Sequence, residues 1–116
     1  MKTLKPIIKE WDCITHDPIE NWEPEDRSMV EFWCNISIGI EGQKGADNFN
    51  VHVTTEKMLS QLAHKDYILV IPYYESWSQV LNILNTKVND ISGINWQGIS
   101  LELSKMFQWE YENYKP

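Results

Sequence analysis

The chain has 116 residues, of which 42% are hydrophobic, and it contains six tryptophans. This length fits one domain, and the aromatic content favours a folded globule because disordered chains contain few aromatic residues. The net charge of −7 would repel phosphate backbones and anionic lipid headgroups. We therefore expect no nucleic-acid partner and no membrane partner.

No segment has the length and apolar character of a signal-peptide core or of a membrane span, so we expect the protein to be cytoplasmic. In that reducing compartment the two cysteines, Cys13 and Cys34, are expected to be buried thiols that fill small apolar sites. A disulfide between them is the less favoured alternative.

The N-terminal part of the chain combines an extended segment, over residues 6–15, with a strongly acidic stretch. Between Glu10 and Glu31 eight carboxylates face a single arginine, Arg27, and Trp11, Trp22 and Trp33 are interleaved with them. Asp17-Pro18 and Glu23-Pro24 make most of this stretch a loop. Negative charge mixed with large aromatic groups is typical of protein interfaces, so the stretch predicts a cationic partner.

Two alternating segments then predict a β-hairpin. Over residues 28–40 the apolar side chains occupy the even positions, and over residues 49–54 they occupy the odd ones. Gly42 and Gly45 between the segments can adopt positive φ, as a tight turn requires. Trp33 breaks the pattern because it stands on the polar face, where it must be covered by another element, lie in a groove or wait for a partner.

After the hairpin, Thr54 or Thr55 can cap a short helix that we expect to end near His64. Residues 67–71 are continuously apolar, which predicts a central strand covered on both faces. Ser76 and Gln79 form a capping-box pattern before an amphipathic helix for which Gly93 is the expected stop.

Asn95 can cap a last helix, and alternation from Phe107 to Glu112 predicts a final strand. The expected fold is therefore α+β, with a mixed or antiparallel sheet, a central hairpin and about three helices packed on one face. No repeat or linker divides the chain, so residues 1–116 are expected to form a single domain.

Catalytic and metal-binding patterns are weak. Cys13 and His16, with His52 and His64, could be considered as zinc ligands, but no second pair is spaced to complete a tetrahedral site. The sequence contains no nucleophile elbow, and its hairpin glycines match neither phosphate-binding fingerprint. We therefore expect no catalytic residue, no bound metal and no cofactor.

A family resemblance adds to these inferences. Its central signature lies in the hairpin and its closing signature near the C-terminus: Phe32, Trp33, Ile38, Gly39, Gly42, Gly45, Asp47, Phe49, Val51, Val53 and Thr54, then Trp96, Leu103, Ser104 and residues 109–114. In this order the residues resemble the immunity protein 8 family of bacterial polymorphic toxin and contact-dependent growth inhibition systems. The likeness covers the chain from about Val30 onward.

The resemblance implies a cytoplasmic antidote that binds the toxic C-terminal domain of a delivered effector and blocks it by occlusion, without catalysis. The shared glycines, tryptophans and strand residues look structural, so the resemblance assigns no binding residue. Many delivered toxins are nucleases and must be basic to hold phosphate, and an acidic inhibitor gains steering and ion pairs from that charge. We expect a monomer or a weak homodimer.

Two surfaces are candidates for contact with the toxin. The first is the acidic stretch, with Trp22 as a buried anchor: Asp17, Glu20, Trp22, Glu23, Glu25, Asp26 and Glu31. The second mixes aromatic and acidic residues at element ends: Tyr73, Tyr74, Glu75, Glu110 and Glu112.

Two other functional classes stay open. A small α+β ligand-binding or catalytic domain should show polar residues converging in an apolar cavity. A subunit of a housekeeping assembly would have no toxin partner. An antidote should instead show an exposed surface that mixes acidic and aromatic residues.

Overall fold

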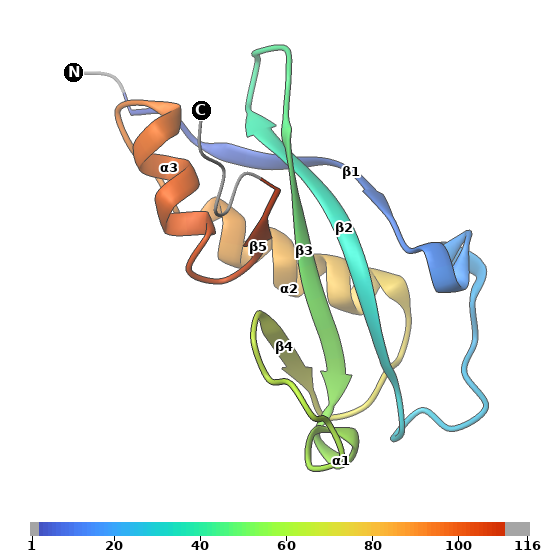
Figure 1. Ribbon diagram of the computed structural model, residues 1–116. Coiled ribbons are helices and arrows are strands. Elements are labelled where there is room, and N and C mark those ends of the chain that lie inside the picture. The colour runs from blue at the N-terminus through green and yellow to red at the C-terminus, as the bar shows by residue number, and fades with distance from the viewer. Residues whose placement is uncertain (1–2, 111–116) are drawn as a thin grey trace.

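The computed structural model describes residues 3–110, and these form one sheet with helices packed against it (Figure 1). The strands are β1 (Pro6–Asp12), β2 (Glu31–Ile40), β3 (Asp47–Thr55), β4 (Ile68–Ile71) and β5 (Gln108–Trp109). The helices are α1 (Glu56–Leu59), α2 (Trp77–Asn89) and α3 (Trp96–Leu103), with 3-10 turns η1 (Ile14–His16) and η2 (Ile19–Asn21). The predicted α+β class is confirmed.

β3 lies at the centre of the sheet. β2 pairs with it antiparallel along one edge, from Glu31 opposite Thr54 to Ile38 opposite Asp47. Two strands share the other edge: β4 runs parallel to residues 52–55, and β5 runs antiparallel to residues 49–50. β1 pairs antiparallel with the outer edge of β2, which makes the sheet mixed.

The β2–β3 hairpin is the one that the sequence predicts. Gly42 and Gly45 have φ of 83° and 92°, a region that side chains rarely adopt, so both turn positions need glycine. Alternation along the two strands buries one set of side chains in the core: Phe32, Cys34, Ile36, Ile38, Ile40, Phe49, Val51 and Val53. Burying a large apolar side chain contributes roughly 1.5–3 kcal/mol, so this set fixes the register.

α2 crosses behind the sheet in the view of Figure 1 and covers its apolar face. Trp77, Val80, Leu84 and Val88 are its buried residues, and the Trp77 ring lies 5.9 Å from that of Trp11 on β1. α3 approaches the same side, where Trp96 donates a hydrogen bond to Asp47. Within residues 3–110 the opposite face of the sheet is therefore left without a covering helix.

The predicted caps of α2 and α3 are present, but the predicted end of α2 is wrong. Ser76 accepts a hydrogen bond from the backbone N–H of Gln79, and Asn95 accepts one from Gly98. α2 ends at Asn89 instead of continuing to Gly93. Gly93 pairs with Leu4 in an isolated bridge, where an added Cβ would lie 3.1 Å from Ile99 Cγ1. The glycine thus serves close packing rather than helix termination.

The predictions for the segment after the hairpin are also wrong in part. α1 stops at Leu59, well before His64, and the Thr55 hydroxyl does not cap it. That hydroxyl donates to the Ser28 carbonyl at 2.7 Å and accepts from the Val30 N–H at 3.1 Å, so it joins the end of β3 to the chain entering β2. The Thr55 hydroxyl that could have capped α1 is therefore engaged in long-range hydrogen bonds.

β4 is an edge strand, not the central strand that its apolar sequence predicts. Its side chains alternate, with Leu69 and Ile71 in the core and Val70 41% exposed on the uncovered face. The final strand, β5, has only two described residues, and Tyr111 and Glu112 lie outside the described residues. None of the helices in residues 3–110 is long and apolar enough to span a membrane.

Candidate protein-interaction site

The acidic loop, defined here as residues 13–30 between β1 and β2, is fastened to the core. Two of its own side chains, Cys13 and Ile19, are buried in the core. Arg27, the only arginine or lysine of the loop, donates from Nη1 to the carbonyl oxygens of Tyr74 at 3.0 Å and Glu75 at 2.6 Å, and its own carbonyl accepts from the Tyr74 N–H. The guanidinium therefore serves to anchor the loop and makes no ion pair with the carboxylates beside it in the chain.

The Trp22 side chain of this loop packs against other aromatic rings. Its ring stacks on His16 with 3.7 Å between centroids, and it contacts Tyr74 at 5.3 Å and the edge of Phe32 at 5.9 Å. Burial lowers the pKa of His16. The half-buried indole is held on several sides and can present a fixed apolar surface.

A groove of about 530 Å³ collects most of the first predicted surface. It is lined by Trp22, Glu23, Glu25, Asp26 and Glu31 together with His16, Pro24, Met29 and Val30. We call it the acidic groove. The other two residues of that surface lie outside its lining: Asp17 is exposed at the end of η1, and Glu20 accepts a hydrogen bond from the Trp11 indole on β1.

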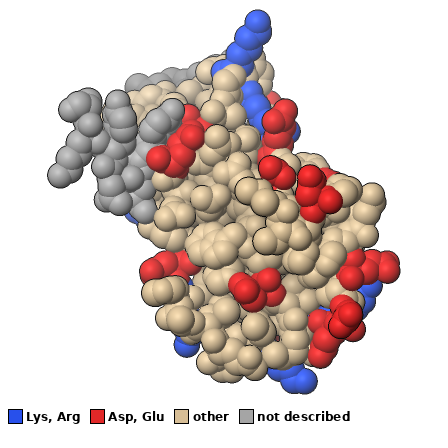
Figure 2. Space-filling view, turned by 45° about the vertical axis from the view of Figure 1, so that its right-hand side comes forward, with Lys and Arg blue, Asp and Glu red and all other residues tan. Residues whose placement is uncertain are grey.

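Hydrogen bonds favour the charged form of one carboxylate in the acidic groove, that of Asp26. Asp26 accepts hydrogen bonds from the Ser28 hydroxyl at 2.7 Å and the Ser28 N–H at 2.9 Å, and these contacts hold its pKa below the ordinary value. Within residues 3–110 the only ion pairs are Glu31 with His52 and Glu102 with Lys105. Figure 2 shows acidic residues around and within a broad uncharged centre, with many of the basic residues near the rim.

The second predicted surface does not form one patch. Tyr73 is 47% exposed and donates its hydroxyl to Glu75. Tyr74, in contrast, is fully buried, which raises the pKa of its hydroxyl to about 12, so its side chain is inaccessible to a partner in this conformation. Glu110 lies near the opposite end of β3, where it accepts from the backbone and side chain of Asn48. Glu112 falls outside the described residues.

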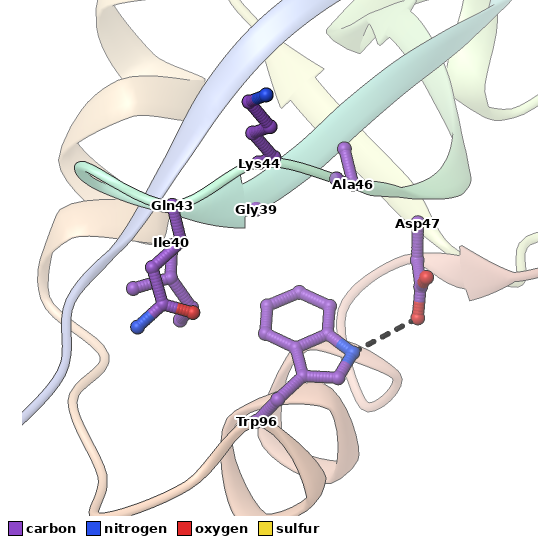
Figure 3. A pocket seen from close by; sticks show the side chains of 8 residues that line it. Gly39, Ile40, Gln43, Lys44, Ala46, Asp47 and Trp96 are labelled. Carbon is purple, nitrogen blue, oxygen red and sulfur yellow. Dashed lines mark hydrogen bonds between the residues drawn. The ribbon is translucent and has the colours of Figure 1, made fainter.

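A second hollow, at the hairpin end of the molecule, is smaller and structural in character (Figure 3). Its volume is about 210 Å³, below the roughly 300 Å³ at which ligand pockets usually begin. Asp47 Oδ2 accepts from the indole N–H groups of Trp96 at 3.0 Å and Trp109 at 3.1 Å. This carboxylate is thus engaged in joining α3 and β5 to β3.

Both cysteines are buried in the core, as predicted, and lie next to each other as free thiols. The contact with the Cys13 thiol and burial both raise the pKa of Cys34, which keeps that group protonated at neutral pH. Among residues 3–110 no three His, Cys, Asp or Glu side chains are grouped so that they could hold a metal ion.

The pairing of Glu31 with His52 was missed at the level of sequence. Glu31 stands opposite Thr54 and beside His52 on the polar face of the hairpin, where His52 Nε2 contacts its carboxylate. The signal was present, because alternation assigns both residues to that face. Predicting the contact between Glu31 and His52 also required the register between the two strands, which the pairing of the core residues determines.

Comparison with known families decides the identity. The profile of the family described as Immunity protein 8 matches residues 7–114, nearly the whole chain. The chain belongs to the immunity protein 8 family. No curated protein and no solved structure matches it.

Membership confirms the resemblance seen in the hairpin and closing signatures and assigns an immunity role. Such a role implies binding of a cognate toxin protein and suggests an inhibitor without catalytic activity. Asp47, Trp96 and Trp109, which all belong to those signatures, meet in one hydrogen-bonded cluster. This cluster accounts structurally for three of the residues that carry the resemblance.

Proposed function

We propose that this immunity protein 8 family member neutralises a basic, nuclease-type toxin domain inside the producing bacterium. The acidic groove binds the toxin and occludes it sterically and electrostatically. The observation that carries the proposal is the set of carboxylates around one groove, Glu23, Glu25, Asp26 and Glu31, with the neighbouring arginine turned toward backbone carbonyls.

The charge arrangement suits fast capture of a basic protein. A surface of one sign of charge raises association rates by about 10 to 10³-fold through electrostatic steering, and close ion pairs across an interface couple by roughly 1.5–7 kcal/mol. Trp22 adds a fixed aromatic surface of the kind that dominates binding energy in interfaces. A cell that makes a toxin needs its inhibitor to bind before the toxin acts.

Association kinetics with the toxin domain encoded beside this protein test the proposal. We expect the quadruple replacement of Glu20, Glu23, Glu25 and Asp26 by lysine to slow association at least roughly tenfold and to weaken its dependence on salt. The fold should survive, because all four side chains are exposed, although the variant loses the bond from the Trp11 indole to Glu20.

A matched control separates position from net charge. Replacing Glu41, Asp66, Asp90 and Glu102 by lysine changes the total charge by the same amount, but these exposed residues do not line the groove. The control should retain most of the wild-type association rate. Equal association rates for both variants would show that the acidic groove is not the contact surface. Failure of the wild type to bind or inhibit the toxin would contradict the proposed function.

A further inference from the structure

The uncovered face of the sheet has an ordered set of polar side chains with an aromatic centre. Across β2 and β3, Asn35 donates to Asn50 at 3.1 Å and Ser37 donates to Asn48 at 2.8 Å. The next pair along the hairpin is Trp33 with His52, whose rings stack with 4.6 Å between centroids and 9° between planes. The polar side chains of this face are thus joined to one another across the two strands.

Trp33 is unusual among these residues because it is 43% exposed although its partner His52 is 6% exposed. One ring face of Trp33 therefore covers the imidazole, and a large part of the indole stays open to solvent. His52 Nδ1 is buried and has no hydrogen-bond partner among the described residues. The side chain that covers this unsatisfied group is thus itself half uncovered.

A groove of about 340 Å³ runs beside Trp33 and is lined also by Asp12, Ile14, Asn35 and Asn50. Ile14 is 87% exposed, which is unusual for a side chain of this size and polarity. Glu31 stands two residues before Trp33 on the same face of β2, and it also lines the acidic groove. The two grooves are therefore neighbours, because Glu31 of one and Trp33 of the other stand two positions apart on the same face of β2.

From this continuity we propose that the toxin-binding surface extends from the acidic groove onto the open sheet face. Trp33 there receives an arginine side chain of the toxin by stacking, with Glu31 and Asp12 as the carboxylates that face the guanidinium. The inference rests on the proposed function, because the basic partner is the toxin domain. It assigns an anchor residue that lies outside the acidic loop.

The charge on this face supports a cationic occupant over an apolar one. Glu10, Asp12 and Glu31 are exposed on its strands. Tryptophan is the aromatic side chain that attracts cations most strongly, and arginine is the cation found most often in such contacts. A partly desolvated stack beside a carboxylate resists dissociation more than it speeds encounter.

Dissociation kinetics of the complex with the adjacent toxin domain test this inference. Trp33→Ala should raise the dissociation rate at least roughly tenfold with little change in association rate, and Trp33→Phe should have a smaller effect. Leu101→Ala is the matched control, because this exposed apolar residue lies on α3, away from the open sheet face. It should leave both rates within roughly twofold of the wild type.

Since Trp33 also covers His52, Trp33→Ala can loosen the fold, and Ile14→Ala provides a second variant. Ile14 lines the same groove but is almost fully exposed, so its replacement should weaken binding by a few-fold without affecting thermal unfolding. Unchanged dissociation for both variants would overturn the sheet-face contact, while slower association of the quadruple lysine variant would still uphold the acidic groove. A change only in self-association would assign the face to a second copy and also overturn the inference.

Discussion

The two ends of β3 use carboxylates in opposite ways. At its start, Asp47 accepts from two indole N–H groups and holds α3 and β5 against the sheet. Beyond its other end, Glu23, Glu25 and Asp26 line a groove and form no ion pair with any described residue. Both ends are rich in tryptophan and acid, so composition alone does not distinguish them.

The two ends therefore separate carboxylates that join parts of the fold from carboxylates that the proposed function uses for binding. The Asp47 cluster consists of residues that carry the family resemblance, and it is satisfied internally. The residues that line the acidic groove all lie before Phe32, outside the hairpin and closing signatures, and Glu23, Glu25 and Asp26 form no ion pair with a described residue. This division fits a domain whose proposed binding groove lies apart from the cluster that joins its closing elements to the sheet.

Breaking the satisfied end should have the largest effect on stability. Asp47→Ala removes two hydrogen bonds to an ionised acceptor, and we expect the free energy of unfolding to fall by about 3 kcal/mol. Asp47→Asn keeps a neutral acceptor and should cost less. Urea denaturation measures both, with Asp90→Ala as an exposed control. A loss as small as that of the control would mean that the cluster does not stabilise the closing elements.

The junction between the two regions should be the next most sensitive point. Thr55→Val removes a buried hydroxyl that joins Ser28 and Val30 to the end of β3, leaving a buried N–H and a carbonyl without this partner. We expect a loss of about 2 kcal/mol in the free energy of unfolding. Thr54→Val is the neighbouring comparison, since the Thr54 hydroxyl makes only a local bond at 3.2 Å.

Amide hydrogen exchange can separate a local effect of Thr55→Val from a global one. The Val30 amide should exchange faster relative to core amides such as that of Val51, because the acidic loop loses an attachment. Equal acceleration at both positions would show that the hydroxyl stabilises the whole domain and has no special role in holding the loop.

Sequence predicted those parts of the fold that depend on neighbouring residues. The alternation of the hairpin, the positive φ of Gly42 and Gly45 and the caps at Ser76 and Asn95 each follow from local chemistry, and the structure confirms them. The edge position of β4 and the short α1 do not follow, because each depends on a distant partner. β4 takes the outer edge of β3, and Thr55 bonds across to the acidic loop.

The candidate site was predictable to a similar extent. Five of the seven residues of the first predicted surface line the acidic groove. Composition could not show that Tyr74 is buried or that Glu110 lies far from Tyr73, because adjacency in space depends on the packing of β3 with its neighbours. The open sheet face needed the register of the hairpin before its polar positions became one surface.

Single charge reversals in the acidic groove should have smaller effects, on association only. Glu23→Lys and Glu25→Lys should each slow toxin association by roughly two- to fivefold at low salt, because each places a positive charge where the partner is positive. Glu20 lies outside the groove lining, and Glu20→Lys should instead lower stability, since Glu20 accepts from the Trp11 indole. Stopped-flow fluorescence measures the rates, with Glu41→Lys as control. Association rates equal to that of the control would show that Glu23 and Glu25 are not part of the binding surface.

The smallest expected effect concerns the ionisation of the acidic groove. The Ser28 hydroxyl, then the Ser28 N–H, lower the pKa of Asp26, and Lys57 acts in the same direction. A carboxyl whose pKa is lower in the folded state stabilises the fold above its unfolded pKa, and this contribution is lost as the pH falls through the folded value. Ser28→Ala should therefore raise the Asp26 pKa, as measured by NMR titration of the carboxyl carbon, while Ser60→Ala should leave it unchanged. A pKa that does not move would show that the backbone N–H alone lowers the Asp26 pKa.

Because Asp26 stays ionised well below neutral pH in either case, toxin association should be independent of pH between neutrality and the ordinary carboxyl range, except for the contribution of histidines on the toxin and on this protein.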